Sequence, residues 1–124
     1  MKKYIIEEYD NRIEYKNEQG QPHREGDKPA IVSVDGTKYW YKNGQLHRDG
    51  DKPAVIWADG TKFWYNNGQL HRDGDKPAVV YADGSELWYK NGVKITEEEA
   101  KKSVSLDGEI VEIKGIKYKL KLVR

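Results

Sequence analysis

The sequence predicts an all-β protein with one short helix. Its expected architecture is an antiparallel β-meander of about 24-residue hairpin repeats, closed by a short helix and a C-terminal β-hairpin. Two observations carry this prediction. A polar segment that starts with histidine recurs almost unchanged at His23, His47 and His71. Each copy also holds an Asp-Gly step between two short runs rich in Val, Ile, Trp and Tyr, a pattern typical of a β-hairpin.

The chain is expected to form one domain over residues 1-124, divided into a cap, three repeats and a closing unit. Residues 1-28 are predicted to be a degenerate N-terminal capping repeat. There, Tyr15-Lys16-Asn17 stands where later copies have Tyr-Lys/Asn-Asn, with two extra residues before Gly20. The hairpin repeats are expected at 29-52, 53-76 and 77-95.

The turn inside each repeat is expected at its Asp-Gly step, because Asp-Gly suits a two-residue type I′ turn. Such a turn places Ile56 opposite Phe63 and leaves Lys62 and Trp57 together on the other face. The first face is the predicted core. Over the three repeats it comprises Ala30, Val32, Val34, Thr37, Tyr39 and Tyr41, then Ala54, Ile56, Ala58, Thr61, Phe63 and Tyr65, then Ala78, Val80, Ala82, Ser85, Leu87 and Tyr89.

The repeat ends at Ile95, and a different unit closes the chain. The segment Thr96-Glu97-Glu98-Glu99 is a capping box, which predicts a short helix over 96-103. Residues 104-124 are expected to form a C-terminal β-hairpin with a turn at Lys114-Gly115. Its last strand alternates apolar residues with lysines, so a row of lysines is expected to guard the edge.

Composition narrows the possible classes of function. The net charge is +1 from 22 basic and 21 acidic residues, so no global field attracts nucleic acid or an anionic membrane. The chain has no cysteine, which excludes disulfides and thiol chemistry. We expect neither a signal peptide nor a membrane span, and a cytoplasmic protein is the default. Four Trp and nine Tyr argue for a folded chain despite 35% charged residues.

The repeat resembles a known family. The step W-Y-x-N-G-x-x-H-R, followed by G-x-x-P-A and A-D-G-T, is similar to MORN-type β-hairpin repeats. It is most similar to a variant found in uncharacterised bacteriophage and large DNA virus proteins. The resemblance covers about residues 4-100, and Pro-Ala replaces the more usual Gly-x-Gly of MORN repeats. It implies a non-catalytic, elongated sheet that serves as a scaffold or binding surface.

The recurring histidine segment is interpreted as a structural loop. Equivalent histidines in consecutive hairpins lie about 9.6 Å apart at the usual strand spacing, too far to share a metal ion. A separate metal or an acid/base site in each repeat is the weaker alternative, and no metal or cofactor is expected. The loop is predicted to be held by hydrogen bonds to backbone and to nearby carboxylates, for instance Arg48 with Asp51. Its residues are His23, Arg24, His47, Arg48, Asp51, His71, Arg72 and Asp75.

Two surfaces are candidates for binding. One is an aromatic face, which is either an interface or a second core face covered by the closing unit; its residues are Trp40, Trp57, Trp64, Tyr81 and Trp88. The other is a basic edge, which either contacts phosphate or is merely solvated; its residues are Lys117, Lys119, Lys121 and Arg124.

The leading hypothesis is a non-catalytic protein-binding module, encoded by a phage or mobile element, that inhibits a bacterial host protein such as a defence-system component. The alternatives are a single-stranded nucleic-acid binder that stacks bases on Trp and Tyr, and a self-assembling repeat protein that dimerises through sheet edges. No catalytic motif is present, so an enzyme is not expected.

Overall fold

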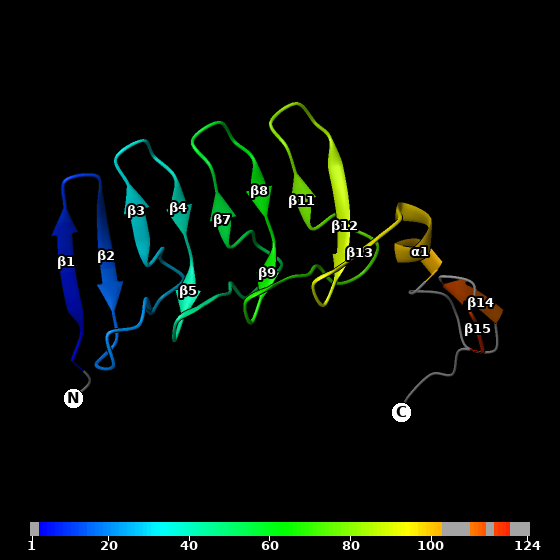
Figure 1. The fold of residues 1–124 in the computed structure, drawn as a ribbon, viewed down its shortest axis with the longest axis horizontal. Helices are drawn as coiled ribbons and strands as arrows, with labels where there is room; N and C mark the ends of the chain where they lie inside the picture. Colours follow the sequence, from blue (N-terminus) through cyan, green and yellow to red (C-terminus); the bar gives the residue numbers. More distant parts are fainter. Residues whose placement is uncertain (1–2, 103–109, 114–115, 120–124) are drawn as a thin grey trace.

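The computed structural model describes residues 3–102, 110–113 and 116–119, and it is built of antiparallel hairpins with one short helix. Figure 1 shows the hairpins side by side in a row, from the N-terminal pair to the third repeat. The predicted all-β architecture is therefore confirmed. None of the described helices is long and apolar enough to cross a membrane.

The main sheet has nine antiparallel strands. In order across the sheet they are β1 (Ile5–Tyr9), β2 (Arg12–Lys16), β3 (Ile31–Ser33), β4 (Lys38–Tyr39), β7 (Val55–Ile56), β8 (Lys62–Phe63), β11 (Val79–Val80), β12 (Glu86–Lys90) and β13 (Val93–Ile95). Two small two-stranded sheets lie below this row in Figure 1, and the strands of each are joined by an Asn-Gly turn. They pair β5 (Tyr41–Lys42) with β6 (Gln45–Leu46) and β9 (Tyr65–Asn66) with β10 (Gln69–Leu70).

The turn at each Asp-Gly step differs from the predicted two-residue turn. In the second repeat the Trp57 N–H donates to the Thr61 carbonyl at 2.9 Å, and the Gly60 N–H donates to the Trp57 carbonyl at 2.9 Å. Gly60 has a φ of 95°, whereas Asp59 has no positive φ. This is a three-residue loop, a type I turn followed by a glycine bulge. The type I′ prediction was wrong because Asp-Gly also suits this longer loop.

The bulge shifts the strand register by one residue and thereby changes which side chains share a face. Phe63 lies opposite Val55, and Lys62 lies opposite Ile56. Since neighbouring residues of a strand point to opposite faces, the predicted grouping of side chains on one core face was wrong, although its members Ala30, Ala54, Ala78, Thr37 and Thr61 are buried. Val55 and Val79 are buried, while Val34 from the predicted core is 77% exposed.

The buried core is thin and divided between the two faces. On the face of Phe63 it consists of small and branched residues, including Val55, Val79, Thr37 and Thr61. The alanines that follow the prolines are fully buried. Trp40 and Trp64 are also buried, at 7% and 8% exposure, where the second strand of their repeat is interrupted.

The N-terminal cap is a hairpin, as expected, but its alignment with the repeats was wrong by one residue. The Tyr15 N–H donates to the Ala30 carbonyl, as the Trp40 N–H donates to the Ala54 carbonyl. Tyr15 therefore occupies the place of Trp40 rather than that of Tyr41. The extra residues close a turn around the Asn17 side chain, whose Oδ1 accepts from the backbone N–H groups of Gln19 and Gln21.

The closing unit begins with α1 (Glu97–Lys102). Its capping box is formed as predicted, because the Glu99 N–H donates to Thr96 Oγ1 at 3.0 Å and the Thr96 N–H donates to the Glu99 carboxylate at 3.3 Å. The predicted C-terminal hairpin is present as β14 (Ile110–Ile113) paired with β15 (Ile116–Lys119). The rest of the predicted segments 96-103 and 104-124 lies outside the described residues.

Candidate functional site

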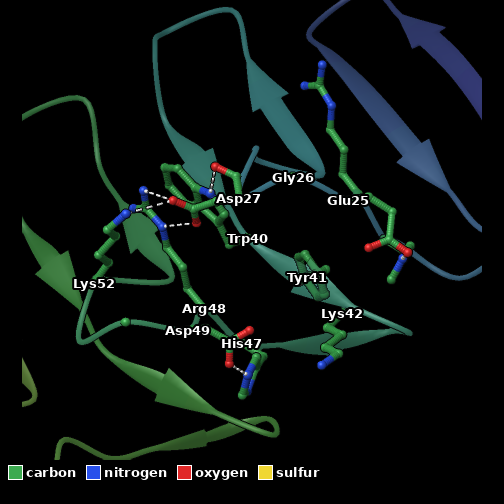
Figure 2. Close-up of a pocket in the computed structure, with 13 residues that line it drawn as sticks. Glu25, Gly26, Asp27, Trp40, Tyr41, Lys42, His47, Arg48, Asp49 and Lys52 are labelled. Atoms are coloured by element: carbon green, nitrogen blue, oxygen red, sulfur yellow. Dashed lines mark hydrogen bonds and ion pairs between the residues drawn. The ribbon is translucent and has the colours of Figure 1, made fainter.

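The histidine segments form one side of the molecule, which we call the loop row and define as residues 23–28, 47–52 and 71–76. Its central feature is an arginine clamp between repeats. Arg48 donates to both carboxylate oxygens of Asp27, at 2.8 and 3.3 Å, and to the Pro53 carbonyl at 3.1 Å. Its guanidinium also lies 3.8 Å from the centre of the Trp40 ring. Figure 2 shows the Arg48 bonds to Asp27, with Lys52 on the same carboxylate.

The clamp recurs one repeat later with almost the same geometry. Arg72 donates to Asp51 at 2.9 and 3.4 Å and to the Pro77 carbonyl at 3.0 Å, and it covers the Trp64 ring at 3.8 Å. The predicted pairing of Arg48 with Asp51 was therefore wrong, because each arginine reaches the carboxylate of the preceding repeat. Among the described residues, Arg24 pairs with no carboxylate of this kind; it bonds the Pro29 carbonyl and stacks on Tyr15.

The clamp lowers the pKa of the aspartates of the loop row that it contacts. The two hydrogen bonds from Arg48, followed by the bond from Lys52, lower the pKa of Asp27 to about 2. The Arg72 guanidinium likewise lowers the pKa of Asp51. The carboxylates are thus ionised at neutral pH and neutralise the arginines that face them. In the groove of about 350 Å³ between the first two loops, the charges of Arg48 and Lys52 are therefore already paired with Asp27.

The histidines also join successive repeats. Nδ1 of His47 accepts from the Asn67 backbone N–H at 3.1 Å, and Nε2 donates to Asp49 at 2.8 Å. His71 repeats both contacts with Asn91 and Asp73, and His23 accepts from the Asn43 N–H. Both ring nitrogens of His47 and His71 are therefore engaged in the neutral tautomer. This geometry matches the structural role predicted for the loop.

The clamp removes two of the five residues of the predicted aromatic face from solvent. Trp40 and Trp64 are buried beneath arginines, and each indole N–H donates to an aspartate carbonyl of the preceding loop, at 3.3 and 3.2 Å. The Trp88 indole N–H makes the same bond to the Asp75 carbonyl at 2.9 Å. Trp88 is half-buried, and no arginine of the described residues stacks on it. These three tryptophans are parts of the repeat packing.

Trp57 belongs to a different surface. It lies on the face of Phe63, with the two ring centres 4.8 Å apart, and remains 42% exposed. Tyr81 takes the corresponding place in the third repeat and is half-buried, whereas the first repeat has Ser33 there. Of the predicted aromatic face, Trp57 and Tyr81 therefore separate from the other three residues. We call their surroundings the tip surface, defined by Tyr39, Trp57, Tyr81, Asp35, Asp59 and Asp83.

Trp57 stands between two open hollows on the tip surface. The hollow toward the first repeat has a volume of about 440 Å³ and is lined by Tyr39, Asp35 and Asp59 as well as Trp57. The hollow toward the third repeat has a volume of about 460 Å³ and is lined by Trp57, Tyr81, Asp59 and Asp83. Each hollow therefore combines two aromatic rings with two carboxylates. Trp57 and Asp59 contribute to both.

The carboxylates of the tip surface are held by their own turns. One oxygen of Asp35, Asp59 and Asp83 accepts the backbone N–H two residues later, at 2.8 to 2.9 Å. The pKa of Asp83 is lowered, chiefly by its side-chain hydrogen bond with Ser85. The second oxygen of each carboxylate accepts no hydrogen bond from any described residue, and none of the three pairs with a cation in this part of the chain.

The turns of the tip surface are linked to one another. Oγ1 of Thr37 accepts from the Ala58 N–H at 3.2 Å, and Oγ1 of Thr61 accepts from the Ala82 N–H at 3.1 Å. Thr61 is 1% exposed, so this bond is shielded from water. Each turn is thereby fixed relative to the next, and so are the aromatic rings and carboxylates that the turns carry.

Tyr39 and the three aspartates of the tip surface were not among the binding residues predicted from the sequence. The aspartates were interpreted only as turn residues, and the register predicted from a type I′ turn put Lys62 beside Trp57. In the structure Lys38 and Lys62 lie on the opposite face, since they pair with Val32 and Ile56. The feature that was not predicted is the glycine bulge. Because the bulge shifts the register, carboxylates lie beside Trp57 in place of the predicted Lys62.

The predicted basic edge is described only in part. Lys117 and Lys119 lie on β15, opposite Glu112 and Ile110. Lys121 and Arg124 lie outside the described residues. The placement of a complete basic edge therefore stays a prediction.

Comparisons with known proteins give no further guide to the site. No protein-family model matches the chain, and neither the curated proteins nor the solved structures contain a match. The likeness to MORN-type repeats stays an expectation that rests on the repeat residues themselves.

Proposed function

We propose that this protein is a non-catalytic protein-binding module and that it binds its partner with the tip surface. The observation that carries the proposal is the exposed Trp57 between two hollows, on a row of turns fixed to one another. Tryptophan is among the residues that contribute most to binding energy in protein interfaces. Although Trp57 contacts Phe63, the repeat does not require a ring at this position, since Ser33 stands there in the first repeat, and the ring stays 42% exposed.

The alternative of single-stranded nucleic-acid binding receives less support. Base stacking needs exposed aromatic rings close to free basic groups. On the loop row Arg48 and Lys52 pair with Asp27, Arg72 and Lys76 pair with Asp51, and the Trp40 and Trp64 rings beneath the two arginines are buried. The exposed ring of Trp57 is instead surrounded by carboxylates, which repel phosphate.

The biological setting of the proposal comes from the resemblance of the repeat to bacteriophage proteins. In that setting the module is encoded by a phage or mobile element and inhibits a bacterial host protein, for example a component of a defence system. Inhibition by occupation of a surface requires no catalytic group, in keeping with a site of aromatic rings and carboxylates.

The test is affinity capture from bacterial lysate with two immobilised proteins, the wild type and a Trp57→Ser/Tyr81→Ser double variant. Serine is the natural residue at the equivalent position of the first repeat, so the double variant is expected to fold. A substitution of Trp40, Trp64 or Trp88 is unsuitable, because these side chains hold the repeats together.

Quantitative mass spectrometry should show a bacterial protein that the wild type retains and that the double variant retains at least about tenfold less. Circular dichroism and melting curves serve as the folding control. Equal retention by both proteins would assign binding to another surface and contradict the proposal for the tip surface.

A further inference from the structure

We infer that the tip surface binds a basic segment of its partner, with one Lys or Arg side chain in each hollow beside Trp57. This inference rests on the proposed function and names the chemistry of the partner. Both hollows offer a cation the same two things, an aromatic ring face and a pair of carboxylates. Aromatic faces attract cations, and carboxylates form charge-assisted hydrogen bonds with guanidinium or ammonium groups.

The molecule already contains filled sites of this chemistry. On the loop row the indole of Trp40 and the carboxylate of Asp27 together hold the guanidinium of Arg48, at 3.8 Å from the ring centre and 2.8 Å from the oxygen. Trp64 and Asp51 hold Arg72 in the same way. The tip surface repeats the indole and the carboxylates, but none of the described cations occupies it. The missing component is therefore a cation supplied from outside.

In the part of the chain that the structure describes, no basic group neutralises the tip surface. Lys38 and Lys62 lie on the opposite face of the sheet. Arg12, which lies opposite Ser33 in the register, pairs with Glu14 at 3.4 Å and stacks on Tyr9 at 4.0 Å. Three carboxylates at successive turns thus form an acidic row, and like charges in a row favour a partner of opposite charge.

The spacing of the row limits the form of the partner. Successive turns lie two strands apart, which is about 9.6 Å at the usual strand spacing. In a polyproline II helix, residues three apart lie on the same side and about 9.3 Å from each other. In an extended strand, by contrast, residues three apart point to opposite sides. The hollows on either side of Trp57 therefore suit an Arg-x-x-Arg segment in the polyproline II conformation.

A direct test uses two synthetic peptides, Ala-Arg-Pro-Pro-Arg-Ala and the same peptide with citrulline in place of both arginines. Citrulline keeps the shape of arginine and removes its charge. Fluorescently labelled peptides are titrated with the wild type, with Trp57→Ser and with Asp59→Asn, and anisotropy is recorded. Asparagine retains the Oδ1 acceptor that the turn needs, so Asp59→Asn removes mainly the charge. Lys62→Gln, on the opposite face, is the matched control.

The arginine peptide should bind the wild type and Lys62→Gln equally, and each of the two tip variants should weaken binding by about fivefold to tenfold. The citrulline peptide should bind at least about tenfold more weakly than the arginine peptide. Equal binding of both peptides, no binding of the arginine peptide, or indifference to Trp57→Ser would each overturn the inference.

Selection from a random octapeptide library separates this inference from the proposed function. The library is selected in parallel on the wild type and on Trp57→Ser. Peptides that need Trp57 and carry Arg or Lys three residues apart would support both proposals. Peptides that need Trp57 but show no enrichment in basic residues would overturn the basic partner and leave the protein-binding surface standing. If no selected peptide depends on Trp57, the tip surface itself is refuted.

Discussion

The contribution of the arginine clamp to stability can be measured by substituting Arg48, with the equivalent Arg24 as the control. Arg48→Met keeps most of the apolar stem and removes three interactions: the Pro53 carbonyl bond, the stack on Trp40 and the pair with Asp27. The carbonyl bond contributes about 1 kcal/mol, the stack about 0.5 kcal/mol and the partly exposed ion pair less than about 1 kcal/mol. The expected loss in the free energy of unfolding is about 2 kcal/mol.

Arg24→Met is the matched control, because Arg24 bonds the Pro29 carbonyl and stacks on Tyr15 without the preceding-repeat carboxylate that the other two arginines bind. Its expected loss is about 1.5 kcal/mol. The difference between the two variants therefore isolates the pair of Arg48 with Asp27. Urea unfolding followed by tryptophan fluorescence measures both losses, and urea is preferred to guanidinium because it carries no charge that would screen the pair.

The pH dependence of this difference follows from the pKa of Asp27. In the folded protein that pKa is about 2 rather than 3.8, first because of the bonds from Arg48 and then because of Lys52. Such a fall corresponds to at most about 2.4 kcal/mol, which solvent screening of a 43% exposed side chain reduces to about 1 kcal/mol or less. A lowered folded pKa stabilises the protein above about pH 4, and this contribution is lost as the pH falls through about 2.

The two variants should therefore differ by about 0.5 kcal/mol at pH 7, and they should converge as the pH approaches about 2. Two results would refute the reasoning. One is an Arg24→Met variant that loses as much stability as Arg48→Met. The other is a difference between the variants that stays constant from neutral to acidic pH.

Three further predictions concern the links between repeats, and thermal melting measures each of them. His47→Ala should cost about 1 kcal/mol by removing the acceptor of the Asn67 N–H, and an unchanged melting curve would contradict its structural role. Thr61→Val should also cost about 1 kcal/mol, since the buried hydroxyl accepts from the next turn, whereas Ser85→Ala should cost less because, among the described residues, the exposed Ser85 hydroxyl bonds only Asp83 of its own turn. Gly68→Ala should cost about 1 kcal/mol or more because its φ is 83°, and a neutral result would mean that the turn relaxes.

Much of the fold could be predicted from the sequence because its signals are local. The period of the histidine segment and the Asp-Gly steps are each determined by neighbouring residues, and the structure contains the corresponding hairpins. The capping box at Thr96 is equally local, and it formed as expected. These features need no knowledge of how one repeat packs on the next.

The details that failed depend on contacts between repeats. Asp-Gly is compatible with both a two-residue loop and a bulged three-residue loop. The bulged loop brings the Ala58 N–H to the Thr37 hydroxyl of the preceding repeat. The pairing of Arg48 with Asp27 spans 21 residues, which a reading of one repeat in isolation cannot reveal. In the candidate site, Trp57 and Tyr81 were named correctly as aromatic residues, but their acidic neighbours depend on the register.

One residue in each turn therefore decides the chemistry of a whole surface. Without the bulge at Gly60, Lys62 would lie beside Trp57 and the ring would have a cation of its own chain, as Trp40 has Arg48. With the bulge, the lysines face away and the indole is left with carboxylates alone. The net charge of +1 thus does not reveal that three carboxylates gather at successive turns while Lys38 and Lys62 lie on the opposite face. A binding surface with an acidic row can exist on a nearly neutral protein because strand register, rather than composition, distributes the charges.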